Sequence, residues 1–256
     1  MPTEGTDVPG REPLTPKQPD ERWVVPVTHR SELRTLLKQS WLTYRQQFPV
    51  ILAVVVAVWV PLECLSSYMD AFVFGGDDIR KSWKFAKFLY DFFGIIATAG
   101  VIFIGQEALA GQRATFRSAL AAGFSSWGRM WWTRLLYQLT IVVGLLLLIV
   151  PGLYLMVRLS LVEPVAVQER ISGSAAMRRS FELTEGRFWL VIRLGLALLF
   201  LFILPTVLIV ATAFVPGLDH WLIDAAIQVI ADVAVAFAAI ALVTTYSHFN
   251  NEKLTA

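Results

Sequence analysis

The chain has 256 residues, of which 56% are hydrophobic and only 16% are charged, and its mean hydropathy is +0.59. Soluble globular domains carry about 25% charged residues, so this composition excludes an ordinary soluble domain and indicates a protein whose solvent is a lipid bilayer. The formal net charge of +2 excludes nothing further, because the placement of Lys and Arg matters more in a membrane protein than their sum. Cys64 is the one cysteine, which excludes an intrachain disulfide and a cysteine metal site.

The two ends of the chain are predicted to be polar tails on the cytoplasmic side. Residues 1–22 contain five prolines and lack the apolar h-region that a cleaved signal peptide requires. This segment cannot bury enough apolar surface to offset its chain entropy, so it is predicted to be disordered. Residues 251–256 form a short polar tail, and residues 23–250 are assigned to one membrane domain.

Six segments are apolar enough to cross a bilayer, for which a helix needs about 20 mostly apolar residues. They are residues 48–68, 88–109, 132–150, 153–169, 188–211 and 221–246. The fourth is the weakest, because it is short and carries Arg158, Glu163 and Pro164. Each charge near the centre of a span costs roughly 2.5 to 3.5 kcal/mol on an insertion scale. The predicted fold is an all-α, polytopic transmembrane bundle of six spans, or of five if the fourth segment is a surface helix.

A hairpin is predicted between the third and fourth segments. Pro151 and Gly152 follow the most apolar run of the chain and form a turn signal. So short a connection would make the fourth segment antiparallel to the third.

Three basic amphipathic helices are predicted at the membrane surface. The first begins near Ser31, the second follows Arg113, and the third runs from Ser174 to about Glu185. The loops that hold the second and third helices are rich in arginine, whereas the turns between spans 3 and 4 and between spans 5 and 6 carry no Lys or Arg. By the positive-inside rule, both termini and all three helices are therefore cytoplasmic. One basic cluster, which this topology places outside, is the exception: Arg80, Lys81, Lys84 and Lys87.

A short pattern shared by the surface helices indicates an internal repeat. Residues 38–41 (KQSW) and 178–181 (RRSF) align at an offset of 140, and Phe48 and Phe188 keep the same offset. The second surface helix carries a weaker echo of the pattern. The chain can therefore be divided into three units, each a basic surface helix followed by a two-span hairpin, that begin near residues 30, 113 and 173. Such repeats are found in membrane transporters and would equally build an inert bundle.

A set of residues in the central segment carries a resemblance to a known family: Pro151, Gly152, Tyr154, Arg158, Pro164, Ala176, Ser180, Leu183, Thr184, Gly186, Phe188 and Trp189. Over about 40 residues this segment resembles a bacterial membrane family of largely unknown function, which includes the membrane domain attached to some glycerophosphoryl diester phosphodiesterases. The resemblance implies a six-span bundle in the bacterial inner membrane. It implies no catalysis, because the soluble phosphodiesterase barrel of the fused proteins needs about 250 residues of its own.

Ionisable side chains at membrane depth are costly and mark candidate functional sites. Glu163 and Asp232 are predicted near mid-bilayer, with Arg158 nearer to the outer side. Asp224, Gln228 and Asp232 recur every four residues and form one polar stripe on the last span. We hypothesise that Arg158 pairs with Asp224 or Asp232 inside the bundle. Such a pair would serve either as a structural contact that orients the fourth span or as part of a substrate or proton path.

The surface helices also offer candidate contacts for anionic lipids, at roughly 1 kcal/mol for each Lys or Arg near the surface. The candidate residues are Arg113, Arg117, Arg129, Arg178 and Arg179. The same charges would arise from retention on the cytoplasmic side alone.

No catalytic, cofactor or metal site is predicted, because no HExxH, GxSxG or phosphate-loop pattern occurs. Nucleic acid is excluded as a partner, since the arginines are needed to set the topology. The leading hypothesis is a scaffold or a lipid-associated component of the envelope, whose partners are the bilayer and another membrane or envelope protein. The alternatives are a small transporter or channel that uses Arg158, Glu163 and Asp232, and then a membrane enzyme. A transporter predicts a cavity that reaches Glu163, whereas a scaffold predicts a packed centre.

Overall fold

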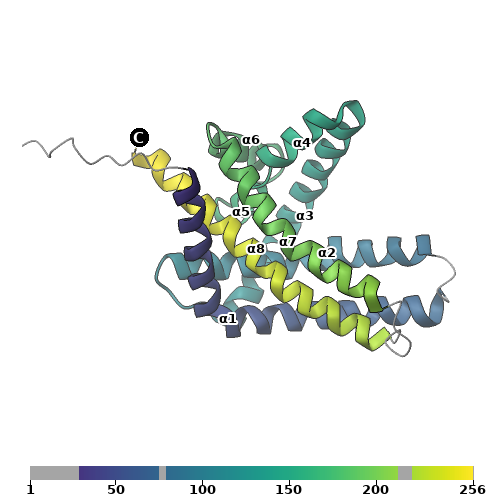
Figure 1. Ribbon diagram of the computed structural model, residues 1–256. Coiled ribbons are helices and arrows are strands. Elements are labelled where there is room, and N and C mark those ends of the chain that lie inside the picture. Colours follow the sequence, from purple (N-terminus) through teal and green to yellow (C-terminus); the bar gives the residue numbers. More distant parts are fainter. Residues whose placement is uncertain (1–28, 75–78, 213–220, 256) are drawn as a thin grey trace, which may run out of the picture.

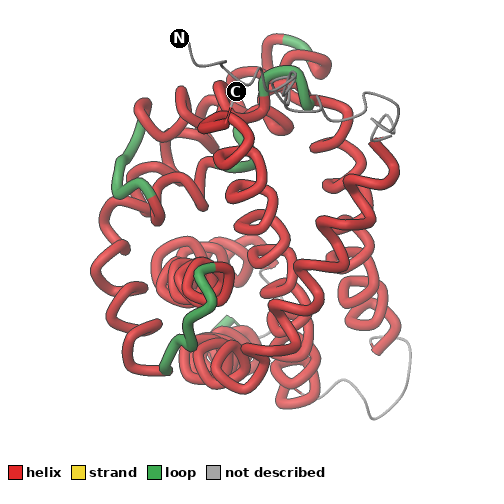
Figure 2. Tube along the Cα trace, turned by 90° about the vertical axis from the view of Figure 1, so that its left-hand side faces the viewer, coloured by secondary structure: helices red, strands yellow, loops and turns green. Residues whose placement is uncertain are grey.

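The computed structural model describes residues 29–74, 79–212 and 221–255, and the predicted tail 1–22 lies outside them. Within these ranges the chain consists of helices and short connections, with no strand (Figures 1 and 2). The all-α fold class is therefore confirmed for the described residues. Among them, five helical segments are long and apolar enough to cross a membrane: Glu32–Val73, Arg80–Leu109, Phe116–Leu147, Ile149–Gln168 and Ala225–Leu254.

Helix α1 (His29–Tyr68) joins the first predicted surface helix and the first predicted span in one continuous helix. A π-helical turn, η2 (Met69–Val73), extends it. Figure 1 shows α1 sharply bent, with its two halves running in different directions. Pro49 stands where the polar half meets the apolar half, and a proline inside a helix removes a backbone hydrogen bond and favours a kink. The surface segment and the span thus remain distinct in direction although the helix does not end between them.

Helices α2 (Ile79–Leu109) and α3 (Phe116–Leu147) are both longer than the spans predicted within them. Thr115 caps α3, since its side chain accepts from the backbone N–H of Ser118 and the Ser118 hydroxyl accepts from the backbone N–H of Thr115. The second predicted surface helix and the third span are joined in α3 without a break. Because the helix is continuous, no helix ends form between the surface segment and the span, and no backbone groups there need capping partners.

The turn predicted at Pro151 and Gly152 is wrong, because both residues lie in helix α4 (Ile149–Arg158). The chain turns at Leu148, whose backbone is extended (φ −161°, ψ 143°) between α3 and α4. Pro151 fits the first turn of α4, where a backbone N–H has no helical partner to lose. Gly152 allows the two arms of the hairpin to meet, because a Cβ there would lie 2.8 Å from the Cα of Leu145.

The fourth predicted span, residues 153–169, is broken into α4 and the short helix α5 (Val162–Gln168). Pro164 in the first turn of α5 cannot donate a backbone hydrogen bond to Ser160, which explains a break at this position. The side chains of α5 are almost all buried, and Leu161, Val162 and Val165 have no exposed surface. Helix α5 therefore lies in the core of the bundle, and a surface position for it is excluded.

Three further helices complete the described chain: α6 (Ser174–Thr184), α7 (Phe188–Thr212) and α8 (Trp221–Thr255). Gly186, at φ +74°, reverses the chain between α6 and α7. The predicted polar tail 251–256 is helical as far as Thr255, because α8 continues through it. Arg187 pairs with Glu252 and Lys253 donates to the backbone carbonyl of Glu182, so the last turns of α8 are attached to the α6–α7 region.

Many large apolar side chains point outward rather than into the core. The tip of the α3–α4 hairpin is the clearest case, since Leu146 is 81% exposed and Val150 is 77% exposed. Soluble proteins rarely expose contiguous apolar patches of this kind, whereas lipid solvates them. Five candidate spans together with these exposed apolar surfaces indicate a multi-pass membrane protein. The fifth predicted span, residues 188–211, corresponds to α7, of which the stretch Phe188–Phe200 qualifies as a shorter apolar helix.

Candidate functional site

An ion pair joins α3 to the buried helix α5. Arg134 donates from Nε and Nη2 to Oε1 of Glu163 at 2.8 and 2.6 Å, and the Tyr137 hydroxyl donates to the same oxygen at 3.1 Å. The two charged side chains are only 16% and 20% exposed. Tyr137 lies one turn after Arg134 on α3, so both donors reach Glu163 from the same face of the helix. This arrangement holds a carboxylate in the apolar interior with three hydrogen bonds.

A second acidic site lies between α1, α2 and α8. Glu63 of α1 is 3% exposed and accepts a hydrogen bond of 2.7 Å from the Tyr90 hydroxyl of α2. Asp232 of α8 lies within electrostatic range of Glu63. Its Oδ2 atom is buried and has no hydrogen-bond partner among the described residues. The site thus brings two carboxyl groups and one hydroxyl donor together from three helices.

A cavity of about 350 Å³, called the central cavity below, lies between α1, α2, α3, α5 and α8 and reaches both Glu163 and Asp232. Its polar lining comes from Arg134, Tyr137, Glu163, Asp232 and Thr98. The rest of its wall is apolar: Val55, Trp59, Ala97, Val101, Val235, Ala236, Ala238, Ala239 and Leu242. A mostly apolar cavity with a few convergent polar groups is the usual form of a small-molecule site.

A second cavity, of about 370 Å³, lies between the first half of α2 and the middle of α3. Its lining includes Trp83, Lys84, Lys87 and Asp91, and Lys87 pairs with Asp91 at 2.6 Å. Arg134 lines this cavity as well as the central one. The Arg134–Glu163 ion pair therefore stands at the boundary between the two cavities.

The predicted polar cluster is only partly brought together. Glu163 and Asp232 line one cavity, as expected, but Arg158 does not pair with Asp232. The Arg158 Cζ atom, at the end of α4, lies 5.1 Å from the ring centroid of Phe181, so this side chain points toward α6. Gln228 is half-buried and the side chain of Asp224 lies outside the described residues.

Arg134 and Glu63 are the functional candidates that the sequence interpretation missed. The positive-inside rule treats Arg134 as a cytoplasmic loop charge, although it stands inside the predicted span 132–150. That position is the signal that identifies it, since a charge within a span is itself a candidate site. Glu63 lies near the far end of the first predicted span, where a charged residue is not unusual and does not by itself indicate a site. Its partner Tyr90 belongs to another helix, so the sequence carries no sign of the contact.

The predicted lipid-contact arginines have different surroundings. Arg113, Arg117 and Arg178 are exposed, in agreement with a surface position. Arg129 is half-buried and lines a third cavity, between α2 and α3.

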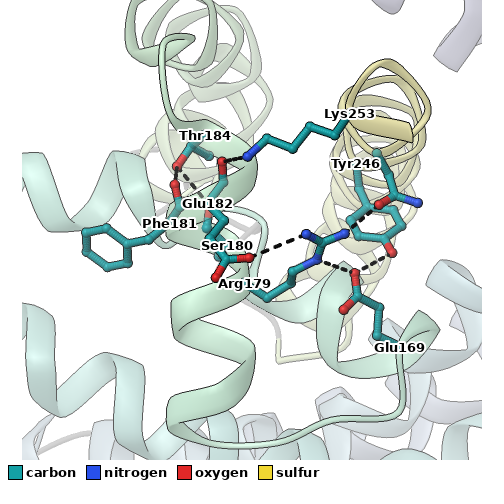
Figure 3. Close-up of polar contacts among 9 residues, drawn as sticks. Glu169, Arg179, Ser180, Phe181, Glu182, Thr184, Tyr246 and Lys253 are labelled. Carbon is teal, nitrogen blue, oxygen red and sulfur yellow. Dashed lines mark hydrogen bonds and ion pairs between the residues drawn. The ribbon is translucent and has the colours of Figure 1, made fainter. Parts of the chain in front are cut away.

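Arg179 belongs to a network that joins α5, α6 and α8 (Figure 3). It donates to Glu169 at 2.8 Å and to Asn250 at 2.7 Å, and Nη1 lies 3.4 Å from a carboxylate oxygen of Glu182. Tyr246 donates to the same Glu169 oxygen at 2.9 Å. The hydrogen bond with Glu169 raises the pKa of the Arg179 guanidinium above its ordinary value. Because protein acceptors surround this guanidinium, Arg179 is a link between helices and a poor candidate for lipid contact.

Some of the residues that carry the family resemblance, among them Arg158, Ser180 and Thr184, lie where α4, α5 and α6 join. The Ser180 hydroxyl donates at 2.8 Å to the backbone carbonyl of Arg158, which the helix break leaves free. Ala176 and Leu183 are fully buried, and Thr184 donates to the carbonyl of Ser180. No family model matches this chain, and no solved structure matches it at a significant level. Membership of the family therefore stays a prediction.

Proposed function

We propose that the protein is a small transporter of the bacterial inner membrane, with cytoplasmic termini and a substrate path through the central cavity. One observation carries this proposal: a cavity of about 350 Å³ reaches both Glu163 and Asp232, and each of them belongs to a helical segment long and apolar enough to span a membrane. A scaffold needs a packed centre and gains nothing from a cavity lined by carboxyl groups, which are costly in lipid. The predicted repeats, which are common in transporters, agree with the proposal.

The Arg134–Glu163 pair suits the role of a gate. It separates the central cavity from the cavity beside Lys84 and Lys87, and Arg134 lines both. A rotamer change of one long side chain would connect the two cavities. Functional charged residues within membrane spans commonly line such paths and pair with one another.

The lining of the central cavity indicates a positively charged substrate. Arg134 is matched by Glu163, which leaves the carboxyl of Asp232 without a basic partner in the wall. Trp59 and Tyr137 add aromatic faces, which attract organic cations. A carboxyl group in this position also serves as a proton carrier. The favoured substrate class is thus a small organic cation, exchanged for a proton at Asp232.

Uptake into reconstituted vesicles tests this function. Vesicles that contain the purified protein and are acidic inside should accumulate radiolabelled benzyltrimethylammonium, and a trapped pH dye should report proton efflux at the same time. Replacing Asp232 with asparagine should reduce both signals to the level of empty vesicles. Ile230 lies on the same helix with its side chain 70% exposed, so Ile230→Ala should transport like the wild type.

A packed scaffold predicts a different result. If neither the cation nor protons move in wild-type vesicles, and a cysteine placed at Thr98 in a Cys64→Ala background resists a water-soluble thiol reagent, the cavity is not a substrate path. A reactive cysteine without flux would indicate a water-filled site of another kind, and the transporter proposal would fail.

A further inference from the structure

A third cavity, of about 670 Å³, lies between the C-terminal end of α2, the first half of α3 and the segment that follows α5. Polar side chains from all three elements line it: Gln106, Glu107, Ser118, Ser125, Ser126, Arg129, Gln168 and Arg170. These ends of α2 and α3 flank the short loop that the positive-inside rule assigns to the cytoplasm. The cavity is separate from the central one, so a ligand bound here does not depend on the proposed transport.

Two hydrogen-bond donors in the wall are buried without a partner. They are Nε of Arg129 and Nε2 of Gln168, neither of which has an acceptor among the described residues. Another nitrogen of Arg129, Nη2, donates to the Ser126 hydroxyl at 3.3 Å, which fixes the guanidinium at the cavity wall. Buried donors normally have acceptors, so each exception calls for an explanation. Neither atom has surface that a ligand in the cavity could touch, so a ligand that brings acceptor oxygens would satisfy them only after the two side chains shifted toward it.

The backbone at Arg170 is held in a conformation that an arginine rarely adopts. Its φ angle is +55°, and it has the one positive φ among the non-glycine residues that the structure describes. Strain of this kind persists where the surroundings require it and is frequent at binding sites. Here it places a second arginine in the wall of the same cavity as Arg129.

We propose that this cavity binds a phosphate group, presented either by the headgroup of an anionic lipid or by a small soluble phosphate compound. Two guanidinium groups, Arg129 and Arg170, outnumber the one carboxylate in the wall, Glu107. The planar fork of an arginine matches the oxygens of a phosphate, and the amide of Gln168 adds a further donor. The volume exceeds that of a bare phosphate ion, which leaves room for the alcohol to which the phosphate is esterified.

Thermal unfolding and titration calorimetry of the full chain in a phosphate-free detergent solution test this proposal. The soluble probes are inorganic phosphate and glycerol 3-phosphate, and the lipid probe is dihexanoyl phosphatidylglycerol, with dihexanoyl glycerol as a control that lacks the phosphate. At least one phosphate compound should raise the unfolding temperature and bind measurably. Replacing Arg129 with glutamine should weaken that binding at least tenfold.

Two variants separate binding from folding. Arg170→Gly should weaken phosphate binding at least tenfold while the unfolding temperature without ligand stays the same or rises, because glycine relieves the strained backbone. Arg80→Gln removes the same charge from an exposed site at the other end of α2 and should leave binding unchanged. A response to the lipid alone would identify a headgroup site, and a response to the soluble compounds alone a metabolite site. Absence of binding to all phosphate probes, or equal weakening by Arg80→Gln and Arg129→Gln, would overturn the proposal.

Discussion

Arg134 and Glu163 form their ion pair where each charge alone would be costly. Removing a carboxylate or guanidinium from water costs several kcal/mol, which the mutual attraction offsets only when the geometry is good and the remaining polar atoms are bonded. Here one carboxylate oxygen accepts three hydrogen bonds, two from Arg134 and one from Tyr137. The pair therefore holds α5 against α3 only while both partners are present.

This dependence predicts an asymmetry between single and double replacements. Arg134→Met should lower the free energy of unfolding by about 3–5 kcal/mol, because it leaves Glu163 charged and unpaired. The double variant Arg134→Met/Glu163→Leu should recover part of that loss, since apolar groups of similar size need no partner, although the Tyr137 hydroxyl loses its acceptor. Denaturant unfolding in detergent micelles measures both effects.

Arg158→Ala is the matched comparison for Arg134→Met. The Arg158 guanidinium contacts the rings of Tyr154 and Phe181, a type of contact worth about 0.5–2 kcal/mol. The Ser180 hydrogen bond goes to the backbone of Arg158 and survives the replacement. A loss for Arg158→Ala as large as for Arg134→Met would contradict this account and would restore the pairing predicted from the sequence.

The sequence was sufficient to predict that Glu163 and Asp232 lie near each other inside the bundle, but it did not reveal Glu63 or the base that meets Glu163. Glu163 and Asp232 were found because charged residues in apolar segments are conspicuous. The partner of Glu163 depends on the direction in which its side chain leaves α5. The break before α5 changes that direction, and the spacing of apolar residues in the sequence does not show by how much. Arg158, five residues away along the chain, was therefore expected in the polar cluster in place of Arg134, which lies on another helix.

At the level of the elements, α2 and α3 pack so closely that a side chain has no room at their contact. A Cβ added at Gly123 of α3 would lie 2.4 Å from the carbonyl oxygen of Ile96 of α2. Small residues allow helix backbones to approach in this way, and dispersion contacts then replace the hydrophobic effect that is absent between helices in lipid. The same two helices form the wall of the cavity beside Lys84, so this contact also fixes the position of Arg134.

Two glycine-to-alanine replacements on α3 should have opposite effects. Gly123→Ala should destabilise the protein by about 1–3 kcal/mol, because the clash is with backbone that cannot move aside. Gly128→Ala should stabilise it by up to about 1 kcal/mol, since a Cβ there meets nothing within 4 Å and alanine favours the helix. Thermal unfolding of the two purified variants and of the wild type measures both changes in stability. Equal melting temperatures would show that the close approach of α2 and α3 is not required.

The positions of the helices followed from hydropathy, whereas their ends did not. The apolar stretches of α2, α3, α7 and α8 coincide with predicted spans. The polar surface segments were expected to form separate helices. Helices α1 and α3 instead continue from a polar segment into an apolar one, because helix hydrogen bonds form within the backbone whichever solvent surrounds it. The end of α8 was missed for a related reason. Its polar last turns are stabilised by contacts with Arg187 and the α6 region rather than by their own sequence.

For the molecule as a whole, helix direction and charge together predict an orientation in the membrane. Figure 1 shows the C-terminal ends of α2 and α8 on the left, and the C-terminal end of α7 with the start of α8 on the right. The left side carries the loop before α3, which the positive-inside rule assigns to the cytoplasm. The same rule then predicts that the basic cluster at the start of α2 lies outside. Two lysines of this cluster do not simply face the solvent, because Lys87 pairs with Asp91 and Lys84 lines the cavity between α2 and α3.

Site-directed labelling tests this orientation, and replacing the single native cysteine, Cys64, removes background labelling. In a Cys64→Ala background, cysteines placed at Gln112 and Leu254 should react with a membrane-impermeant maleimide only after the cells are opened. A cysteine at Arg80 should react in intact cells, because this exposed residue begins the helix that crosses to the α2–α3 loop. All three should label equally in detergent, which controls for intrinsic reactivity. Labelling of the Gln112 and Arg80 positions from the same side would mean that α2 does not cross the membrane, and a path through the cavities that it lines would then be impossible.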